Sequence, residues 1–336
     1  MIFVEPSVTP VNEPDLTKKI ERCFRICYQS EDKMTDSDTF IKSIINKEGK
    51  NKHWSPLEHG RICLKVDGRI AAALADWETA RCTRFLKIDY DYKDAQGAYI
   101  IRVTGNFRTF REFITAFDPD FDKSRNDLTE RAVAQLMISI ELNKYFPALI
   151  NKIENFPEGV IPNTKMFHIC CQYLGEADDY QTFRVVTSRD MLQQLARHRS
   201  HSFSVESTKF INYTKKQGFT FCIPRPAPWA DVDWNKINSY HPDSIDFENP
   251  MIEIFVKHAH DCCEKYEKLI SLGLKAQEAR QVLPGFYKTE LFLSGTISGW
   301  KNFLSLRNDS HADPKIQILA VEMEKYLREH KPEWFK

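Results

Sequence analysis

The part of this chain that is richest in chemically useful side chains is residues 197–210. It opens with three side chains that can carry positive charge, Arg197, His198 and Arg199. Serines and a threonine follow, with Glu206 and Lys209 among them. Hydroxyl groups, backbone amides and cations together suit a phosphate or another anionic ligand. A solvated surface turn has the same composition, and the residues alone leave both interpretations open.

The residues just before this run predict the helix that positions it. Thr187 or Ser188 can cap a helix, and Asp190 complements its N-terminal dipole. We expect an inward face of Leu192, Leu195 and Ala196. The other face would carry, at positions i, i+3 and i+4, an amide, a guanidinium and an imidazole: Gln194, Arg197 and His198. A polar loop is then expected to wrap the ligand that they hold.

The run resembles the signature of the flavin-dependent thymidylate synthases, Arg-His-Arg-x-x-Ser-x-Asn-Glu-x-Ser-x-Arg-Tyr. Five of its fixed positions are matched, by Arg197, His198, Arg199, Ser202 and Ser207. The final Arg-Tyr pair is represented by Lys209 and Phe210. The Asn-Glu pair is replaced by Ser204 and Val205, with Glu206 one position late.

Two stretches nearer the N-terminus are similar to other segments of the family. Residues 25–30 fit an Arg-x-Cys-Tyr-x-Ser pattern, which implies that Ser30 contacts the flavin. Residues 53–59 fit His-x-Ser/Thr-x-x-Glu-His, which implies the same for His53, Ser55 and Glu58. Read without the family, Ser55 followed by Pro56 predicts the capped start of a helix, and a plain N-cap remains an alternative.

The C-terminal third carries two more similar segments. Residues 279–284 fit Ala-Arg-x-x-Leu-Pro, which implies that Arg280 holds the nucleotide. Residues 302–312 fit Asn-Phe-Leu-x-Leu-Arg-x-x-x-x-Ala, so Asn302 is implied as a flavin contact and Arg307 as the catalytic residue. Ser298 is a further implied flavin contact, in a stretch where the family has an asparagine and an arginine.

The resemblance implies reductive methylation of deoxyuridine monophosphate (dUMP) to dTMP. Methylenetetrahydrofolate would supply the carbon, NADPH the reducing equivalents and FAD the hydride. The flavin contacts implied are Ser30, His53, Ser55, Glu58, Arg197, His198, Arg199, Ser298 and Asn302. The substrate contacts implied are Gln194, Arg197, Glu206, Ser207, Thr208, Lys209, Arg280 and Arg307.

The fold implied is α/β of the α+β type, with a central antiparallel sheet flanked by helices and a homotetrameric assembly. We expect one domain over residues 1–336, with an insertion of mixed structure at about 76–180. Arg307 would favour ionisation of the N3–C4 edge of the uracil. No cysteine would act as nucleophile, because a hydride from reduced flavin removes the need for one.

Composition narrows the class of protein. The 336 residues contain 47 basic and 47 acidic side chains, so the chain lacks the general positive charge of a nucleic-acid binder. The N-terminus does not have the pattern of a signal peptide, and no apolar run is long enough to span a membrane. Nine cysteines, an odd number without a Cys-x-x-Cys, indicate a reduced cytoplasmic protein, in a host cytoplasm if the source is viral.

The sequence also bears on metal binding and on two rival functions. His258, His260 and Cys262 are spaced two residues apart, which points them to different faces of a helix, so we expect no metal site. A nucleotide- or RNA-binding protein on the same scaffold that has lost catalysis, or a purely structural subunit, would also fit parts of the sequence. The first rival would purify without the yellow colour of a flavoprotein.

Periodicity and turn residues predict the remaining elements. Strands are expected at residues 2–4, 99–103, 180–186 and 219–224, with two short strands within 61–75. Helices are expected from about residue 15, at 106–117, at 128–154 with a possible kink at Pro147, and at 251–272, 289–306 and 313–330. Residues 225–250 are expected to form a proline-rich loop.

Overall fold

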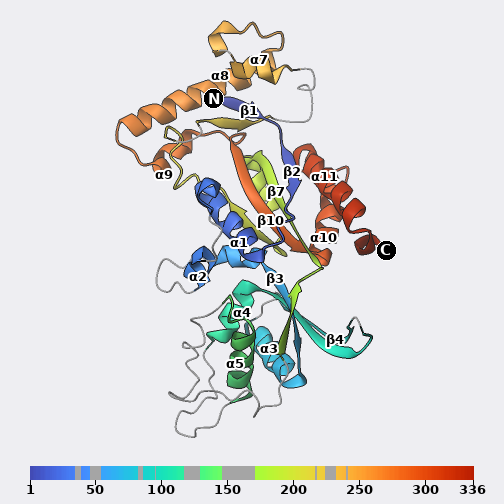
Figure 1. Ribbon diagram of the computed structural model, residues 1–336. Helices are drawn as coiled ribbons and strands as arrows, with labels where there is room; N and C mark the ends of the chain where they lie inside the picture. Colours follow the sequence, from blue (N-terminus) through green and yellow to red (C-terminus); the bar gives the residue numbers. More distant parts are fainter. Residues whose placement is uncertain are drawn as a thin grey trace. The chain divides into compact units, whose positions relative to one another are not determined.

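The computed structural model describes residues 1–34, 39–45, 54–81, 86–94, 96–116, 129–145, 171–215, 218–223, 232–239 and 241–336 (Figure 1). The chain divides into two compact units. The first unit consists of Met1–Asn12, Arg22–Lys33 and Gln181–Lys336, and the second of Glu13–Glu21 and Met34–Tyr180. Within the described residues, no helix is long and apolar enough to cross a membrane.

The first unit is built around a four-stranded sheet. Its order is β2 (Ser7–Pro10), β7 (Tyr180–Ser188), β10 (Lys288–Thr296) and β8 (His201–Val205), and the β2–β7 and β10–β8 pairs are antiparallel. Figure 1 shows the helices α10 (Ile297–Arg307) and α11 (Pro314–His330) beside this sheet. Phe183 and Leu293 of the sheet share one apolar core with Trp300, Phe303 and Met323 of the helices.

A second apolar core of the first unit includes the buried face of α8 (Pro250–Ser271). Asn249 caps this helix by accepting a hydrogen bond from the amide of Met251, and Pro250 stands at its first position. The core also takes residues from the parallel pair β1 (Ile2–Val4) and β9 (Thr220–Cys222). The predicted helix at 251–272 and the predicted strands at 2–4 and 219–224 are confirmed.

The second unit has its own antiparallel sheet, in the order β4 (Leu86–Lys93), β5 (Tyr99–Asn106), β3 (Arg61–Val66) and β6 (Cys171–Glu176). The helices are α3 (Gly68–Arg81), α4 (Phe107–Ile114) and α5 (Glu130–Glu141), with α2 at Thr39–Ile45. Asn106 caps α4, and Phe107, Phe110 and Phe113 are buried as their spacing predicts. Helix α1 (Leu16–Arg25) confirms the helix expected near residue 15. Antiparallel sheets flanked by helices confirm the α/β class.

One predicted strand of this unit is wrong. The prediction placed two short strands within residues 61–75, but β3 is followed by helix α3. Asp67 accepts hydrogen bonds from the amides of Arg69 and Ile70 at 3.0 and 3.1 Å, which starts a helix where a turn was expected. Ile70, Leu74 and Trp77 then lie buried on one helical face, a spacing of 3.6 rather than 2 residues.

The helix predicted at 289–306 is also wrong in its first half. Residues 288–296 form β10, an inner strand of the sheet, and α10 begins only at Ile297, where Thr296 caps it. Most of β10 is buried, so it lacks the polar alternation that marks a half-exposed strand.

Two other segments differ from the predictions, and one agrees with them. The helix expected at 128–154 ends as α5 at Glu141, and Pro147 lies outside the described residues. The loop expected at 225–250 contains the short helix α7 (Trp234–Ser239). The helix expected at 313–330 is confirmed by α11.

Candidate functional site

Helix α6 (Arg189–Leu195) begins where strand β7 ends and leads directly into the Arg-His-Arg run. Met191 and Leu195 are buried, whereas Ala196 is exposed because the helix has ended and Ala196 is its C-cap. The expectation that Ala196 faces inward is therefore wrong. Ser188 occupies the N-cap position, but its hydroxyl bonds to the Asp190 carboxylate instead of a backbone amide.

Arg307 at the end of α10 meets this run, although 109 positions separate it from His198. Arg307 Nε donates to His198 Nε2 at 2.8 Å. The other guanidinium nitrogens donate to Gln194, to its side-chain Oε1 at 3.3 Å and its carbonyl at 3.1 Å. Gln194 in turn donates to Asp313 at 3.0 Å. The structure thus joins three predicted site residues in one hydrogen-bonded cluster.

Burial and charge set the protonation of this cluster. His198 is 5% exposed, and burial together with the positive charge of Arg307 lowers its pKa to about 4. Its Nε2 therefore accepts from Arg307 as neutral imidazole, with the proton on Nδ1. Burial and the nearby charge of Arg197 lower the pKa of Arg307, against the opposing effect of Asp313. Arg307 is a confined cation next to a neutral base.

The flanking arginines differ from His198. Arg197 and Arg199 are exposed, and among the described residues neither forms an ion pair with a carboxylate. Exposed guanidinium groups without an acidic partner are available to an anionic ligand. This property, together with the position of Arg197 near Arg307, makes the cluster one candidate anion site of the first unit.

The polar loop expected after Arg199 is a strand. Residues 201–205 form β8, which pairs antiparallel with β10 from His201↔Gly295 to Val205↔Leu291. The neighbouring strand satisfies the backbone amides, so serines at 202 and 204 lie buried in a sheet despite their low strand propensity. Only the following residues, from Glu206 on, form the loop.

Glu206 begins that loop and is 2% exposed. Its Oε1 accepts hydrogen bonds from Gln29 Nε2 and the Tyr213 hydroxyl, both at 3.0 Å. Lys288 Nζ lies 3.1 Å from its Oε2 and 2.8 Å from Glu290. Burial acts to lower the pKa of Lys288, but the two carboxylates outweigh it and the pKa is raised. The sequence did not predict Lys288 and Tyr213 as site residues, because no local pattern indicates that both contact Glu206.

Thr208 and Arg280 meet farther along the loop. Arg280 Nη1 donates to Thr208 Oγ1 at 2.9 Å. Both line a cavity of about 510 Å³ together with Arg189, Asp190, Leu192, Gln193, Gln281, Leu283, Pro284 and Gly285. Ser207 is half-buried and Lys209 is exposed. Two guanidinium groups and a hydroxyl at one cavity suit a phosphate.

The remaining predicted contacts of the first unit lie in two places. Ser30 is half-buried, and its hydroxyl bonds to the carbonyl of Arg25 at 3.4 Å. Ser298 and Asn302 are exposed on α10, with Ser298 Oγ 3.1 Å from Thr296 Oγ1. All three can reach solvent and hence a ligand.

Ser55 and Glu58 belong to the second unit. Ser55 is the first residue of a 3-10 helix (Ser55–His59), but Trp54 is its N-cap and no side chain caps it, so the predicted Ser55 cap is wrong. A proline inside a single short turn leaves few free amides for a cap to bind. Glu58 pairs with Arg108 at 2.5 Å. His53 lies outside the described residues.

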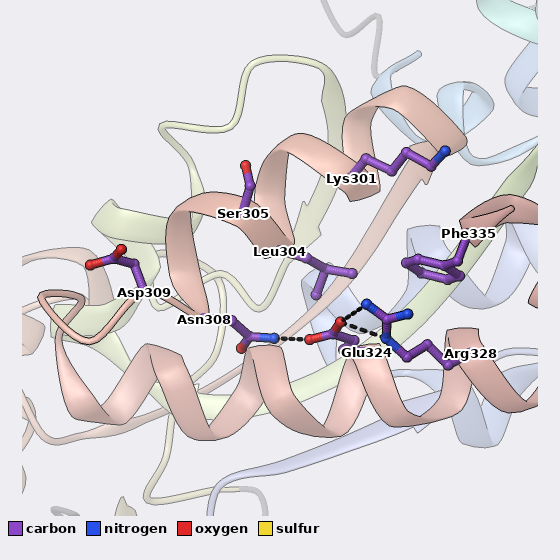
Figure 2. Close-up of a pocket in the computed structure, with 8 residues that line it drawn as sticks. All are labelled: Lys301, Leu304, Ser305, Asn308, Asp309, Glu324, Arg328 and Phe335. Atoms are coloured by element: carbon purple, nitrogen blue, oxygen red, sulfur yellow. Dashed lines mark hydrogen bonds and ion pairs between the residues drawn. The ribbon is translucent and has the colours of Figure 1, made fainter.

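A further cavity of the first unit lies between α10 and α11 and holds about 470 Å³ (Figure 2). It is lined by Lys301, Leu304, Ser305, Asn308, Asp309, Glu324, Arg328 and Phe335. Glu324 accepts from Asn308 and from Arg328, as Figure 2 shows. None of the predicted site residues lines this cavity, and its strongest charges neutralise each other.

The described residues contain no group of His, Cys, Asp or Glu arranged to hold a metal ion. In helix α8, His258 Nε2 lies 3.7 Å from Cys262 Sγ. This is a hydrogen-bonding distance and not a metal-ligand arrangement.

Comparison with known proteins agrees with the motifs. The flavin-dependent thymidylate synthase of Thermosipho melanesiensis is 28% identical over 155 residues, which cover 46% of this chain and 66% of the relative. That of Wolinella succinogenes is 30% identical over 145 residues, covering 43% and 64%. The chain thus spans just under two thirds of the length of these curated relatives.

Solved structures give weaker matches. Thymidylate synthase X from Helicobacter pylori with FAD and dUMP is 24% identical, covers 44% of this chain and 66% of its own, and has a TM-score of 0.32. A UMP/dUMP methylase, PolB from Streptomyces cacaoi, bound with 5-Br dUMP, is also 24% identical, covers 45% and 67%, and has a TM-score of 0.36. The assignment to a family therefore depends on the sequence.

The family described as thymidylate synthase complementing protein matches residues 11–135 and 180–333. These two segments make up most of the chain and include every described motif that carried the resemblance. The chain therefore belongs to the thymidylate synthase complementing protein family, the family of the flavin-dependent thymidylate synthases.

Proposed function

We propose that this protein is a flavin-dependent thymidylate synthase that methylates dUMP to dTMP. Methylenetetrahydrofolate would donate the one-carbon unit and NADPH the two electrons that reduce it to a methyl group. The observation that carries the proposal is the cluster of Gln194, His198 and Arg307, which joins two separate family motifs by direct hydrogen bonds.

Arg307 is the proposed catalytic residue. A guanidinium has five N–H donors, and the three bonds to His198 and Gln194 leave two for a ligand. Because those bonds also fix its plane, the remaining donors point in a set direction and need no reorganisation during the reaction. They would stabilise negative charge at the N3–C4 edge of the uracil.

The phosphate of dUMP is assigned to the cavity at Arg280 and Thr208, with Ser207 and Lys209 beside it. Arg280 offers a guanidinium that touches a hydroxyl rather than a carboxylate, so its charge is not neutralised there. Gln194 and Arg197 complete the proposed substrate contacts. Glu206 is a further expected substrate contact, but its carboxylate is buried and already bonded to Gln29 and Tyr213.

The residues present fit FAD. Arg197 and Arg199 are exposed cations without a described carboxylate partner, which suits the pyrophosphate, and Ser30, Ser298 and Asn302 offer accessible polar groups. His53, Ser55 and Glu58 are the proposed contacts of the other motif, while His198 acts through Arg307. Bound FAD would supply hydride transfer, which this chain's side chains do not provide.

A tetramer and an inserted segment belong to the same proposal. The family match covers residues 76–135 and is interrupted between 135 and 180, so it leaves only residues 136–179 of the insertion expected at about 76–180 unmatched. We propose that the chain assembles as a homotetramer and that the inserted segment is an addition to the shared catalytic scaffold.

The deciding experiment measures release of tritium from C5 of labelled dUMP, with FAD, methylenetetrahydrofolate and NADPH added to the purified protein. We expect release and dTMP formation that depend on all three additions. A colourless protein that binds dUMP without releasing tritium would instead be a nucleotide-binding relative that has lost catalysis. A colourless protein that takes up no FAD would overturn the proposal.

A further inference from the structure

Three contacts join two segments that carry proposed ligand contacts. The N-terminal turn (residues 26–30) ends at Ser30, and the Ser207 loop (residues 206–210) contains the proposed phosphate contacts. The amide of Ser207 donates to the carbonyl of Cys27 at 3.1 Å. The rings of Tyr28 and Phe210 lie 5.4 Å apart. Gln29 Nε2 donates to Glu206 Oε1 at 3.0 Å.

Gln29 is in an unusual conformation. Among the described residues it is the one non-glycine residue with a positive φ, +46°. A left-handed backbone is unfavourable for a residue with a Cβ atom and persists where surrounding contacts hold it. The contacts here include the bond from the Gln29 amide to the carbonyl of Ile26 and the side-chain bond to Glu206. The direction in which the chain leaves the turn at Ser30 depends on them.

Glu206 is itself held from the sheet. Its carboxylate is buried, receives the Tyr213 hydroxyl and faces Lys288 on strand β10. Lys288 also pairs with Glu290, and Glu290 with Arg184 at 2.6 Å. A buried carboxylate with several donors is costly to move, because any bond lost leaves a charge unsatisfied. Binding a substrate directly would require Glu206 to give up these bonds.

We propose that Glu206, held by Lys288 and Tyr213, is a positioning residue that fixes the N-terminal turn and the Ser207 loop in one arrangement, so that the flavin and nucleotide sites are built together. This inference rests on the proposed function. It gives the displaced glutamate of the family motif a role in this chain that does not require contact with the nucleotide.

The main test is Gln29→Gly in the full-length protein. Glycine adopts the left-handed conformation without strain, so the backbone is kept and the bond to Glu206 is lost. Titrations with FAD and, separately, with dUMP should show both Kd values raised on the order of tenfold, as expected for one hydrogen bond to a charged group. Tyr213→Phe removes the other donor to the same oxygen and should shift both values in the same direction.

Two controls separate positioning from general destabilisation. Glu253→Gln makes the acid-to-amide change at an exposed helical pair, Glu253–Lys257 at 2.7 Å, and should leave both Kd values unchanged. A double-mutant cycle of Gln29→Gly with Glu206→Gln should be non-additive, while Gln29→Gly with Glu253→Gln should be additive.

The outcomes are distinct. The inference is overturned if Gln29→Gly and Tyr213→Phe leave both Kd values unchanged, or alter only one ligand. It is also overturned if Glu206→Gln abolishes dUMP binding while those two variants bind normally, because Glu206 would then be a direct ligand. A parent protein that binds neither FAD nor dUMP would overturn the proposed function itself, and this inference with it.

Discussion

At the scale of single residues, Arg307 and Arg280 offer the same functional group in different surroundings. Arg307 is fixed by His198 and Gln194, and its remaining donors are the ones proposed to stabilise the pyrimidine edge. Arg280 touches Thr208 at the mouth of a cavity. The first should act mainly on charge that develops during the reaction, and the second on a phosphate that is charged throughout.

Arg307→Ala should lower kcat by roughly 10²–10³, or about 3–4 kcal/mol, as for loss of a preorganised donor. Arg280→Ala should instead raise the KM for dUMP and leave kcat nearly unchanged. Steady-state kinetics of dTMP formation measures both. Lys265→Ala is the control, since Lys265 forms an exposed pair with Asp261 on α8, outside these motifs. Equal effects of Arg307→Ala and Arg280→Ala, confined to KM, would contradict the division of roles.

His198 should make the stability of the fold depend on pH. Its folded pKa of about 4 lies below the ordinary value of 6.5, because burial and Arg307 oppose protonation. Between these values the unfolded chain binds more protons than the folded chain, so the free energy of unfolding falls as pH falls from 6.5 towards 4.

In His198→Asn, the urea midpoint should therefore change less between pH 7 and 4.5 than in the parent protein. His311→Asn serves as the control, since His311 is almost fully exposed. Identical pH profiles for the parent and His198→Asn would show that the imidazole does not titrate as described.

No cysteine is expected to be the nucleophile. Burial raises the pKa of Cys27 to about 11, and burial likewise raises the pKa of Cys222 and of Cys263 to about 12, so their thiolates are scarce at neutral pH. Cys82 and Cys170 lie outside the described residues. Replacing each cysteine by alanine or serine should leave dUMP methylation in every folded variant. Loss of turnover in one variant, with a covalent dUMP adduct on that cysteine in the parent, would refute this.

At the scale of elements, the turn before β3 depends on close packing at Gly60. A Cβ atom there would lie 2.5 Å from Ile20 Cδ1 and 2.8 Å from Phe107 Cδ2, and both side chains are fully buried. Gly60→Ala should therefore lower the free energy of unfolding by about 1–3 kcal/mol.

Gly68→Ala is the matched control for this substitution. Gly68 is the first residue of α3, and a Cβ atom there meets nothing within 4 Å. Urea unfolding should show this variant unchanged or slightly more stable, by up to about 1 kcal/mol. If Gly60→Ala is as stable as Gly68→Ala, the packing described at Gly60 is wrong.

At the scale of the whole molecule, the assembly is the main expectation. Four chains of 39.3 kDa give about 157 kDa, and light scattering at working concentration should find this mass. Cross-linking should give species up to four chains at protein concentrations where activity is constant. A mass near that of one chain, in a preparation that makes dTMP, would contradict the tetramer.

The sequence by itself determined the elements whose signals are local. Helices α4, α8 and α11 were predictable because their buried residues recur with the helical period and because Asn106, Asn249 and Asp313 cap them. Membership of the family was predictable too, since residue types in a fixed order identified it. Both kinds of information lie within a few neighbouring residues.

Tertiary structure decided what depends on partners far along the chain. Strands β8 and β10 were misjudged because one is polar and the other almost wholly buried, and each is a strand by virtue of pairing with the other. The bond between Arg307 and His198 and the burial of Glu206 against Lys288 arise only once those strands and α10 are assembled. A buried charge is stable only beside its partner, and no local pattern states which distant residue that partner is.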